Sequence, residues 1–513
     1  MDHTSSLRTY SKKERNLYLI GLAGQNVIYS ASTVLAYYYQ FTLLIPAMAV
    51  SLILSLNQIL DAIKDPLMGN IMDHTRSKWG KARPYVLFTP IPIGILLILC
   101  FINHIYDPAQ PMGSGQNLFV ILWASLSYFL FGLAFSASDI PLHSLPNLMT
   151  EDENDRTKII SLKTTAMLIG MLGMVVQPLS IQVGKIFARE SLQTQRSEQL
   201  GFFLVVSIFS VIGSALFQLT GLFVKEHISL PKGHVSVKEN FKLMWENKPF
   251  RAVLLSGILA SPKAVETVGA MPLFTYYYAN KDPLKIILYT IIISGGSYLG
   301  RVIASNIVPL LSKKYEKVKL FIFSNLMSAI PMLIVFLLFL FNPFRMANVF
   351  LLVLTALCYT ISGTLTAIQS IVATLFISDA VDYEEYQTGR RPDGTFVSGQ
   401  TITTKLSSGI SSLIGGSIYA LAGFSDQRIA ELNTFIAGGG MVKESLEFTS
   451  DMRVLFFLAT IPTVIGAILC IIPMIKYPLT DATHEQILKN LNLRRHVDQQ
   501  QKNENDSSEP EKD

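Results

Sequence analysis

Long uncharged apolar segments recur along the whole chain and restrict the folds that it can adopt. Residues 43–60 carry no charge and are about as long as the hydrocarbon core of a bilayer requires. Half of the 513 residues are hydrophobic and only 15% are charged, whereas a soluble protein carries roughly a quarter charged residues. Twelve candidate spans, each with a run of about 20 mostly apolar residues, lie near residues 16–41, 43–72, 84–103, 117–149, 159–184, 202–224, 252–280, 285–311, 318–342, 347–378, 396–423 and 453–475. The sequence therefore predicts an all-α polytopic membrane protein with 12 transmembrane helices.

The basic residues indicate how these segments are oriented. If the N-terminus is cytoplasmic, the cytoplasmic segments hold 28 of the 42 Lys and Arg residues, the external loops hold 9, and 5 lie inside spans. Because cytoplasmic loops carry the excess of Lys and Arg, we expect both termini in the cytoplasm and the protein in the plasma (inner) membrane. The formal net charge of +5 then reflects topology, and we expect no nucleic-acid partner.

Three features of the first half recur in the second half. The tyrosine triplet at 37–39 returns at 276–278, Ser138 and Asp139 return as Ser378 and Asp379, and a lysine at 163 returns at 405, at offsets of 239 to 242 residues. The tyrosines alone could be interfacial aromatic belts, but together the features favour a duplicated six-helix unit, as in the major facilitator architecture. We expect an N-terminal segment at 1–15, a bundle at 16–224, a cytoplasmic linker at 225–251, a second bundle at 252–477 and a largely disordered cytoplasmic tail at 478–513.

Three ionisable residues share one face of the second span. Asp61, Lys64 and Asp65 are spaced i, i+3 and i+4, so each can contact the others on a helix. Each charge costs about 2.5 to 3.5 kcal/mol at the centre of a bilayer, so we expect the three to face the bundle interior or a wet cavity. The alternative is an interfacial helix end, but apolar residues still follow Asp65 before the first basic loop.

A fourth acid, Asp139, lies in the fourth span near Ser136 and Pro141. Pro141 frees a backbone carbonyl one turn earlier, which adds an oxygen near the carboxylate. Carboxylate and hydroxyl oxygens of spans 2 and 4 are the hard ligands that a small cation such as Na⁺ prefers, so these acids are expected to meet in one cavity. A salt bridge that locks the two helices is the alternative for Asp139.

Further charges interrupt spans 5, 7 and 11. Lys163 and Lys405 must each pair with a carboxylate or face water. Lys163 could also extend to the nearby membrane interface, whereas hydroxyl residues surround Lys405 and favour a wet cavity. Lys263 and Glu266, three residues apart, are expected to pair with each other.

The loop between spans 2 and 3 combines basic residues with an acid and a glycine. Its key positions are Asp73, Arg76, Gly80 and Lys81. This pattern suits a charged contact between helices that can open and close, which a simple excess of Lys and Arg would not require.

From about residue 13 to residue 477 the chain resembles the glycoside-pentoside-hexuronide:cation symporters, the family of melibiose permease. The resemblance lies in Asp61-Ala-Ile-Lys-Asp65-Pro-Leu-Met-Gly69, Asp73-His-Thr-Arg76-Ser-Lys-Trp-Gly80-Lys81, Asp139-Ile-Pro141 and Asp379-Ala-Val-Asp382-Tyr383. It implies a secondary active sugar symporter of the major facilitator fold. By resemblance, the cation site would be Asp61, Asp65 and Ser136, and the sugar site would use Asp139, Lys163 and Lys405. The cytoplasmic gate after span 10 would contain Asp379, Asp382, Arg390 and Arg391.

Three residues depart from the pattern of melibiose permease. Lys64 replaces a cation-ligating asparagine, Asn26 replaces a sugar-binding aspartate, and His143 replaces a tryptophan that stacks on the sugar. An ammonium beside Asp61 and Asp65 would repel a metal ion, so H⁺ coupling or no coupling becomes the expectation in place of Na⁺. The identity of the sugar stays open.

Other functions remain as alternatives. An uncoupled facilitator, or a carrier of another amphipathic solute, would have the same fold, since a fold does not determine a substrate. The chain has no HExxH, GxSxG or Walker A motif and no Cys/His metal cluster, so we do not expect an enzyme or a cofactor. A sensor would need an output domain that the short tail does not provide. We expect a functional monomer whose partners are a small sugar and the lipid bilayer.

Overall fold

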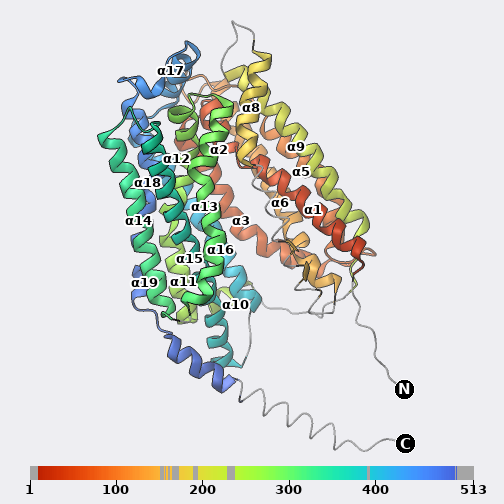
Figure 1. Cartoon of the computed structure of the whole chain (residues 1–513). Coiled ribbons are helices and arrows are strands. Elements are labelled where there is room, and N and C mark those ends of the chain that lie inside the picture. The colour runs from red at the N-terminus through yellow and green to blue at the C-terminus, as the bar shows by residue number, and fades with distance from the viewer. Residues whose placement is uncertain are drawn as a thin grey trace, which may run out of the picture.

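The computed structural model of the protein is almost entirely helical. It describes residues 10–150, 155, 158–159, 162–163, 173–188, 195–227, 237–312, 314–389, 393–491 and 493. The N-terminal half contains α1 (Lys12–Ser32), α2 (Leu35–Tyr37), η1 (Tyr38–Thr42), α3 (Ala47–His74), α4 (Arg83–Phe88), α5 (Pro90–Cys100), α6 (Gly115–Met149), α8 (Gly173–Phe187) and α9 (Gln195–Phe223). Figure 1 shows these helices beside those of the C-terminal half, with the termini of the described chain, at the start of α1 and at the helix of residues 481–491, at the same end of the molecule.

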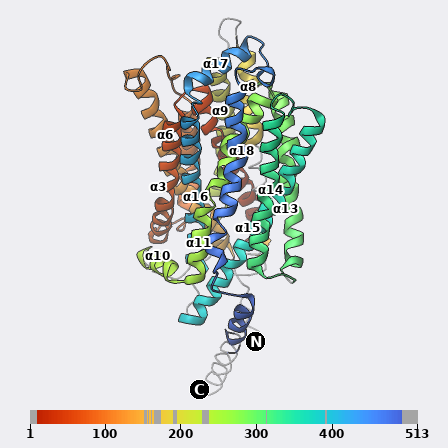
Figure 2. The same cartoon turned by 90° about the vertical axis from the view of Figure 1, so that its left-hand side faces the viewer.

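The C-terminal half follows the short helix α10 (Val237–Glu246). It contains α11 (Lys248–Leu259), η3 (Ser261–Val265), α12 (Glu266–Leu273), η4 (Phe274–Tyr278), α13 (Pro283–Leu311), α14 (Lys317–Phe341), α15 (Val349–Thr388), α16 (Asp393–Leu421), α17 (Asp426–Ala437), η5 (Val442–Glu444), α18 (Thr449–Leu469) and α19 (Ile472–Ile475). A quarter turn of the view shows α17 and α8 at the end opposite the termini (Figure 2).

The helices correspond closely to the apolar segments of the sequence. Within the described residues, nine helical segments are long and apolar enough to cross a membrane, and α16 with α17 forms a tenth that bends by 76°. The expected third span is divided at Thr89 into α4 and α5. Residues 160–161 and 164–172 of the expected fifth span lie outside the described residues, and its second part forms α8. The protein is therefore a multi-pass membrane protein.

The seventh span is discontinuous near its middle. A 3₁₀ turn, η3, separates α11 from α12, with Pro262 at its start, and Pro272 lies inside α12. Both tyrosine triplets lie beside or within wide π-helical turns, η1 and η4, and these turns meet where Phe41 packs against Tyr276 with ring centroids 5.5 Å apart. Transporters often place irregular helix segments of this kind beside their binding sites.

The first part of the expected tail at 478–513 contains a helix. Residues 481–491 form a helix, and Leu479, Ile487 and Leu491 are buried in an apolar cluster with Phe321 and Phe376 of the C-terminal half. Three apolar side chains are enough to dock one face of this helix, although most residues of the tail are polar. The overall composition of the tail therefore does not reveal the docking. Apart from residue 493, the chain beyond 491 is outside the described residues.

Candidate functional site

The longest contact between the two halves runs along α3 and α16. Near the end opposite the termini, Gly416 approaches Ser51 so closely that an added Cβ would lie 1.8 Å from the serine Oγ. One helical turn further along α3, the Ser55 hydroxyl donates a 2.7 Å hydrogen bond to the Gly409 carbonyl. Small residues on both helices thus allow the backbones to approach. The charged residues predicted on α3 and α16 lie further along the same two helices.

An ion pair between Lys405 and Asp65 continues this contact and joins the halves. The Asp65 side chain is 10% exposed and the Lys405 side chain 24% exposed, so both charges are largely removed from water. The second carboxylate oxygen of Asp65 is buried and has no hydrogen-bond partner among the described residues. Lys405, expected by resemblance in a sugar site, therefore neutralises an acid of the expected cation site.

Asp61 pairs within the N-terminal half. The Lys64 ammonium lies 2.7 Å from the Asp61 carboxylate, at the i, i+3 spacing seen in the sequence, and it lies 5.2 Å from the centre of the Phe129 ring. Asp61 and Asp65 thus each have their own lysine. Ser136 is buried, but no hydrogen bond joins its hydroxyl to Asp61 or Asp65 in the described structure. The expected oxygen site for a metal ion is therefore occupied by two ammonium groups and lacks the serine.

Asp139 lies apart from these pairs and faces α1. Its carboxylate accepts a 2.7 Å hydrogen bond from Gln25 and lies 3.4 Å from Nε2 of His143. Lys163 is close enough to act electrostatically on both Asp139 and His143. The described partners of Asp139 differ from those of Asp61 and Asp65, and the expectation that the three acids share one cavity stays a prediction.

Gln25 was missed by sequence reasoning, although an isolated amide in an apolar span was a usable signal. Its neighbour Asn26, at the expected sugar position, donates instead to the Leu22 carbonyl of its own helix at 2.8 Å. Tyr29, one turn further along α1, is within electrostatic range of both Asp139 and Lys405. This tyrosine links the Asp139 cluster to the ion pair that joins the halves.

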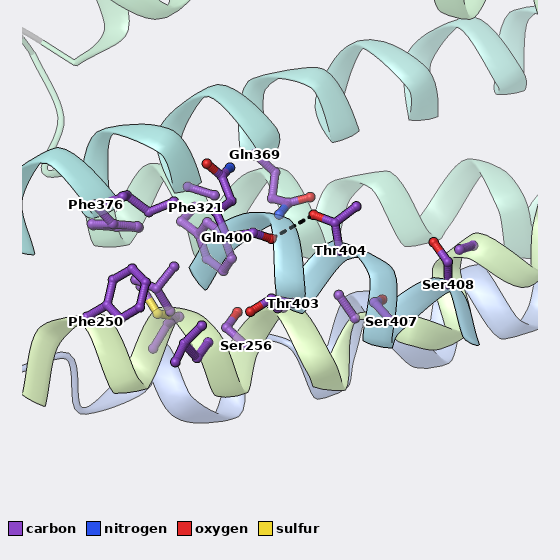
Figure 3. Close-up of a pocket in the computed structure, with 18 residues that line it drawn as sticks. Phe250, Ser256, Phe321, Gln369, Phe376, Gln400, Thr403, Thr404, Ser407 and Ser408 are labelled. Atoms are coloured by element: carbon purple, nitrogen blue, oxygen red, sulfur yellow. Dashed lines mark hydrogen bonds between the residues drawn. The ribbon is translucent and has the colours of Figure 1, made fainter. Parts of the chain in front are cut away.

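The hydroxyl residues around Lys405 line a separate cavity on the other side of α16. The cavity has a volume of about 240 Å³ and is lined by Gln369 of α15 and by Thr403, Thr404, Ser407 and Ser408 of α16. Figure 3 shows these side chains together with three phenylalanines, Phe250, Phe321 and Phe376. Lys405 is directed toward α3 instead. The hydroxyl residues that are next to Lys405 in the sequence thus belong to a different face of the helix.

Lys263 and Glu266 do not pair with each other as expected. The Lys263 ammonium donates to Asn325 of α14, and to Gln369 of α15 at 3.3 Å. Glu266 interacts with Thr463 and, electrostatically, with Arg301. Neighbouring helices offered partners that the spacing along one helix could not reveal.

Residues of the expected gate after span 10 lie at the end that holds the termini. Lys317 pairs with Asp379, and His484 of the tail helix lies 3.5 Å from Asp379 and 3.1 Å from Asp382. Asp481 adds a 3.0 Å hydrogen bond from the backbone amide of Lys317. Arg390 and Arg391 lie outside the described residues. This cluster therefore connects α14 and α15 to the tail.

The 2-to-3 loop contacts Glu226 through its backbone, and the expected opening and closing contact of its charged residues stays a prediction. Glu226 accepts hydrogen bonds from the backbone amides of Lys81, Ala82 and Arg83 at 2.7 to 3.0 Å, which caps the start of α4. Gly80 has a φ of +107°, and an added Cβ would lie 2.3 Å from the Glu226 carboxyl carbon. Arg76 is exposed, and the side chain of Asp73 lies outside the described residues.

At the opposite end a buried network joins the halves. Lys281 forms a 2.5 Å ion pair with Glu198 of α9, and the two side chains are only 12% and 7% exposed. Glu198 also accepts a 2.7 Å hydrogen bond from Thr42, and Lys281 donates to Asn433 at 3.1 Å. Gln177 donates to Thr275 at 2.9 Å beside this network. Sequence reasoning missed Glu198 and Lys281 because they lie in or next to loops, where charges are ordinary.

Comparisons with known proteins agree with this architecture. Residues 17–481 match the model of a family described as MFS/sugar transport protein. The chain is 26% identical to the inner membrane symporter YicJ of Escherichia coli (strain K12), covering 83% of this chain and 86% of YicJ. It is also 26% identical to the isoprimeverose transporter of Lactiplantibacillus pentosus, covering 80% of each chain. Among solved structures, a bacterial homologue of the human lysosomal transporter Spinster, inward-facing and unoccupied, superposes with a TM-score of 0.60 at 12% identity, covering 93% and 98% of the two chains.

We predict that Asp65 and Lys405 are energetically coupled. Lys405→Gln leaves the Asp65 carboxylate buried without its partner, which costs about 3 to 5 kcal/mol and should lower the melting temperature in detergent. Adding Asp65→Asn removes that charge, so the double variant should be more stable than Lys405→Gln alone. The exposed pair Glu485 and Lys489, 2.9 Å apart, is the control and should show no measurable coupling. Additive effects of the two substitutions at 65 and 405 would contradict the prediction.

Proposed function

Because the chain belongs to the MFS/sugar transport protein family, we propose that it is a secondary active transporter that moves a sugar or glycoside together with a proton. The observation that carries the coupled mechanism is the ion pair between Asp65 and Lys405, since its partners belong to different halves. In this fold the halves rock around a central site. A rocking motion that separates α3 from α16 at this depth would remove the lysine from Asp65, which could then bind a proton.

A proton suits this site better than Na⁺ does. Asp61 and Asp65 already have ammonium partners, and a metal ion would have to displace or approach both. A proton needs only one carboxylate oxygen, and the unpartnered Asp65 oxygen is available to it. Asp65 is therefore the proposed coupling residue, while Lys64 pairs with Asp61 and excludes metal ions.

Asp139 is the proposed sugar-binding residue. Its carboxylate lies with an amide donor, an imidazole and a nearby lysine, a set of groups that can exchange hydrogen bonds with several sugar hydroxyls. A bound sugar would replace Gln25 or His143 as the partner of the carboxylate. Hydrogen bonds to an ionised acceptor are about twice as strong as neutral ones, which favours a carboxylate here.

We further propose that the termini lie in the cytoplasm and that the protein acts as a monomer in the inner membrane. In that orientation, the Glu198–Lys281 network closes the external side. At the other side, Lys317, Asp379 and His484 contact one another and not the 2-to-3 loop, within the part of the chain that the structure describes. The structure then corresponds to an inward-open state, and the external network must break when the carrier opens outward.

Replacement of Asp139 by Asn should weaken sugar binding without unfolding the protein. The amide keeps the shape but loses the charge, and a hydrogen bond to a charged group contributes about 1.5 to 3 kcal/mol, which corresponds to roughly 10- to 100-fold in affinity. Isoprimeverose, the sugar in the name of one relative, is the first probe for counterflow in proteoliposomes, within a panel of glycosides. Asp107→Asn, in an exposed loop, is the matched control. Unchanged affinity in Asp139→Asn would show that the sugar binds elsewhere.

Wild-type uptake should follow a pH gradient and not a Na⁺ gradient. In Lys64→Asn, Asp61 loses its ammonium partner and gains space, so Na⁺ or Li⁺ should stimulate uptake. Lys319→Asn removes an exposed lysine and should leave the cation dependence unchanged. If an imposed Na⁺ gradient alone drives wild-type uptake, proton coupling through Asp65 is wrong. If no gradient drives it, the protein is an uncoupled facilitator.

Loss of the external ion pair should shift the carrier toward outward-open states. Glu198→Gln leaves the Lys281 ammonium without a counter-charge in the closed state, a penalty of about 3 to 5 kcal/mol. A cysteine introduced as Thr275→Cys reports the change, because Thr275 is buried beside this network. Its labelling by a membrane-impermeant maleimide should increase strongly in Glu198→Gln and stay low in the control Glu431→Gln. Equal labelling in all three backgrounds would mean that the pair does not hold this end closed.

A further inference from the structure

A second polar cavity lies within the C-terminal half, apart from the ion pair between Asp65 and Lys405. It has a volume of about 460 Å³ and lies between α12, α13, α14 and α15. Glu266 is the one acid among its lining residues, and the coupling mechanism proposed above does not use it. An acid that lines a cavity within a membrane span is expected to serve a function.

Glu266 lies beside the break in the seventh span. It is the first residue of α12, directly after the 3₁₀ turn η3. Irregular backbone within a membrane is tolerated only where it is buried in protein or lines a water-filled cavity. Lys263 belongs to the same turn, but its ammonium contacts Asn325 and Gln369 instead of Glu266. The basic residue nearest in sequence therefore does not neutralise this acid.

The helices around Glu266 offer it weaker partners than a direct ion pair. On α13, the Arg301 guanidinium acts electrostatically on the carboxylate, but the two groups form no direct ion pair in the described structure. On α18, the Thr463 hydroxyl interacts with the carboxylate. On α15, Tyr359 is within electrostatic range, but its hydroxyl donates to the Ala459 carbonyl at 3.4 Å. The lining residue from α14 is apolar. The negative charge of an ionised Glu266 is thus only partly compensated, and a bound proton would remove it.

The cavity connects Glu266 to exposed polar side chains. Arg301 of α13 and Ser370 of α15 are exposed, whereas Glu266 is half-buried. Thr366 lies one helical turn before Ser370 and also lines the cavity. Each water molecule takes up about 30 Å³ in the liquid, so the cavity has room for several. Water molecules and hydroxyl groups together form a route by which a proton can reach the carboxylate.

Glu266 and Asp65 depend on different contacts. Lys405 neutralises Asp65 across the two halves. The neighbours of Glu266 on α13, α15 and α18 all belong to the C-terminal half. A motion that separates α3 from α16 would therefore free Asp65 but leave the surroundings of Glu266 together. The two acids can bind protons separately.

We propose that Glu266 is a second proton-binding site of the carrier, so that two protons accompany each sugar. A hydronium ion in the cavity transfers its proton to a carboxylate oxygen, which leaves water and a neutral acid, and release reverses this step. Arg301 favours the ionised acid and thereby the release of the proton. This inference rests on the proposed transport function and adds the number of coupling protons.

The number of protons per sugar is the first test. In proteoliposomes, a neutral sugar such as isoprimeverose accumulates until its gradient balances the proton-motive force. At about 59 mV, two protons per sugar permit about 100-fold accumulation, and one proton permits about 10-fold. The wild type and Glu266→Asp, which keeps a carboxyl group, should reach the higher value, and Glu266→Gln the lower one. Glu316→Gln changes a glutamate whose side chain is 55% exposed, and this matched control should equal the wild type.

Infrared spectroscopy of the full-length protein in detergent is the second test, and it does not depend on transport. Acid titration of the wild type should produce a carbonyl-stretch component at the higher frequency typical of a protonated carboxyl group that is shielded from water. This component should be absent from Glu266→Gln and unchanged in Glu316→Gln. Its absence from the wild type, or its persistence in Glu266→Gln, would show that Glu266 does not bind a proton in this way.

The remaining outcomes separate this inference from the proposed function. A wild type limited to one proton per sugar, or equal accumulation by the wild type and Glu266→Gln, would overturn the second site as a coupling site. If Asp65→Asn keeps both protons, coupling through Asp65 fails and Glu266 is not affected. If uptake is uncoupled or no sugar moves, the proposed function fails, and the infrared component alone decides whether Glu266 binds a proton.

Discussion

The cost of placing charge in a low-dielectric environment determines how this protein is assembled. Asp61 and Lys64 offset that cost by pairing within one helix, whereas Asp65 and Lys405 can pair only when the two halves are in contact. A second pair between the halves, Glu198 and Lys281, lies at the end opposite the termini. The position of one half relative to the other is thus tied to the pairing of charges, in addition to the packing of small residues along α3 and α16.

The sequence was a good guide to the helices and to contacts within one helix. Uncharged segments of about 20 residues located the spans, and the i, i+3 spacing predicted the contact between Asp61 and Lys64. Charged residues inside apolar segments also pointed to the residues of the candidate site. These predictions succeeded because helix periodicity and insertion cost are local properties of the chain.

Contacts between distant helices could not be predicted in this way. Asp65 and Lys405 are separated by 340 residues, and either could have found another partner, as Lys263 did with Asn325 and Gln369. Asp139 turned toward Gln25 because α1 offered an amide donor at the right depth. The docking of the tail helix was concealed by a polar composition, although three spaced apolar residues were enough to bury one face.

The ion pair between Asp65 and Lys405 also has an electrical consequence. When the pair is intact it carries no net charge, so moving it through the membrane field requires no electrical work. A carrier whose Asp65 has taken a proton carries one additional positive charge, on which a membrane potential of 100 mV acts with about 2.3 kcal/mol for a complete crossing. The voltage across the membrane would therefore drive the loaded carrier inward and leave the return of the empty carrier almost unaffected.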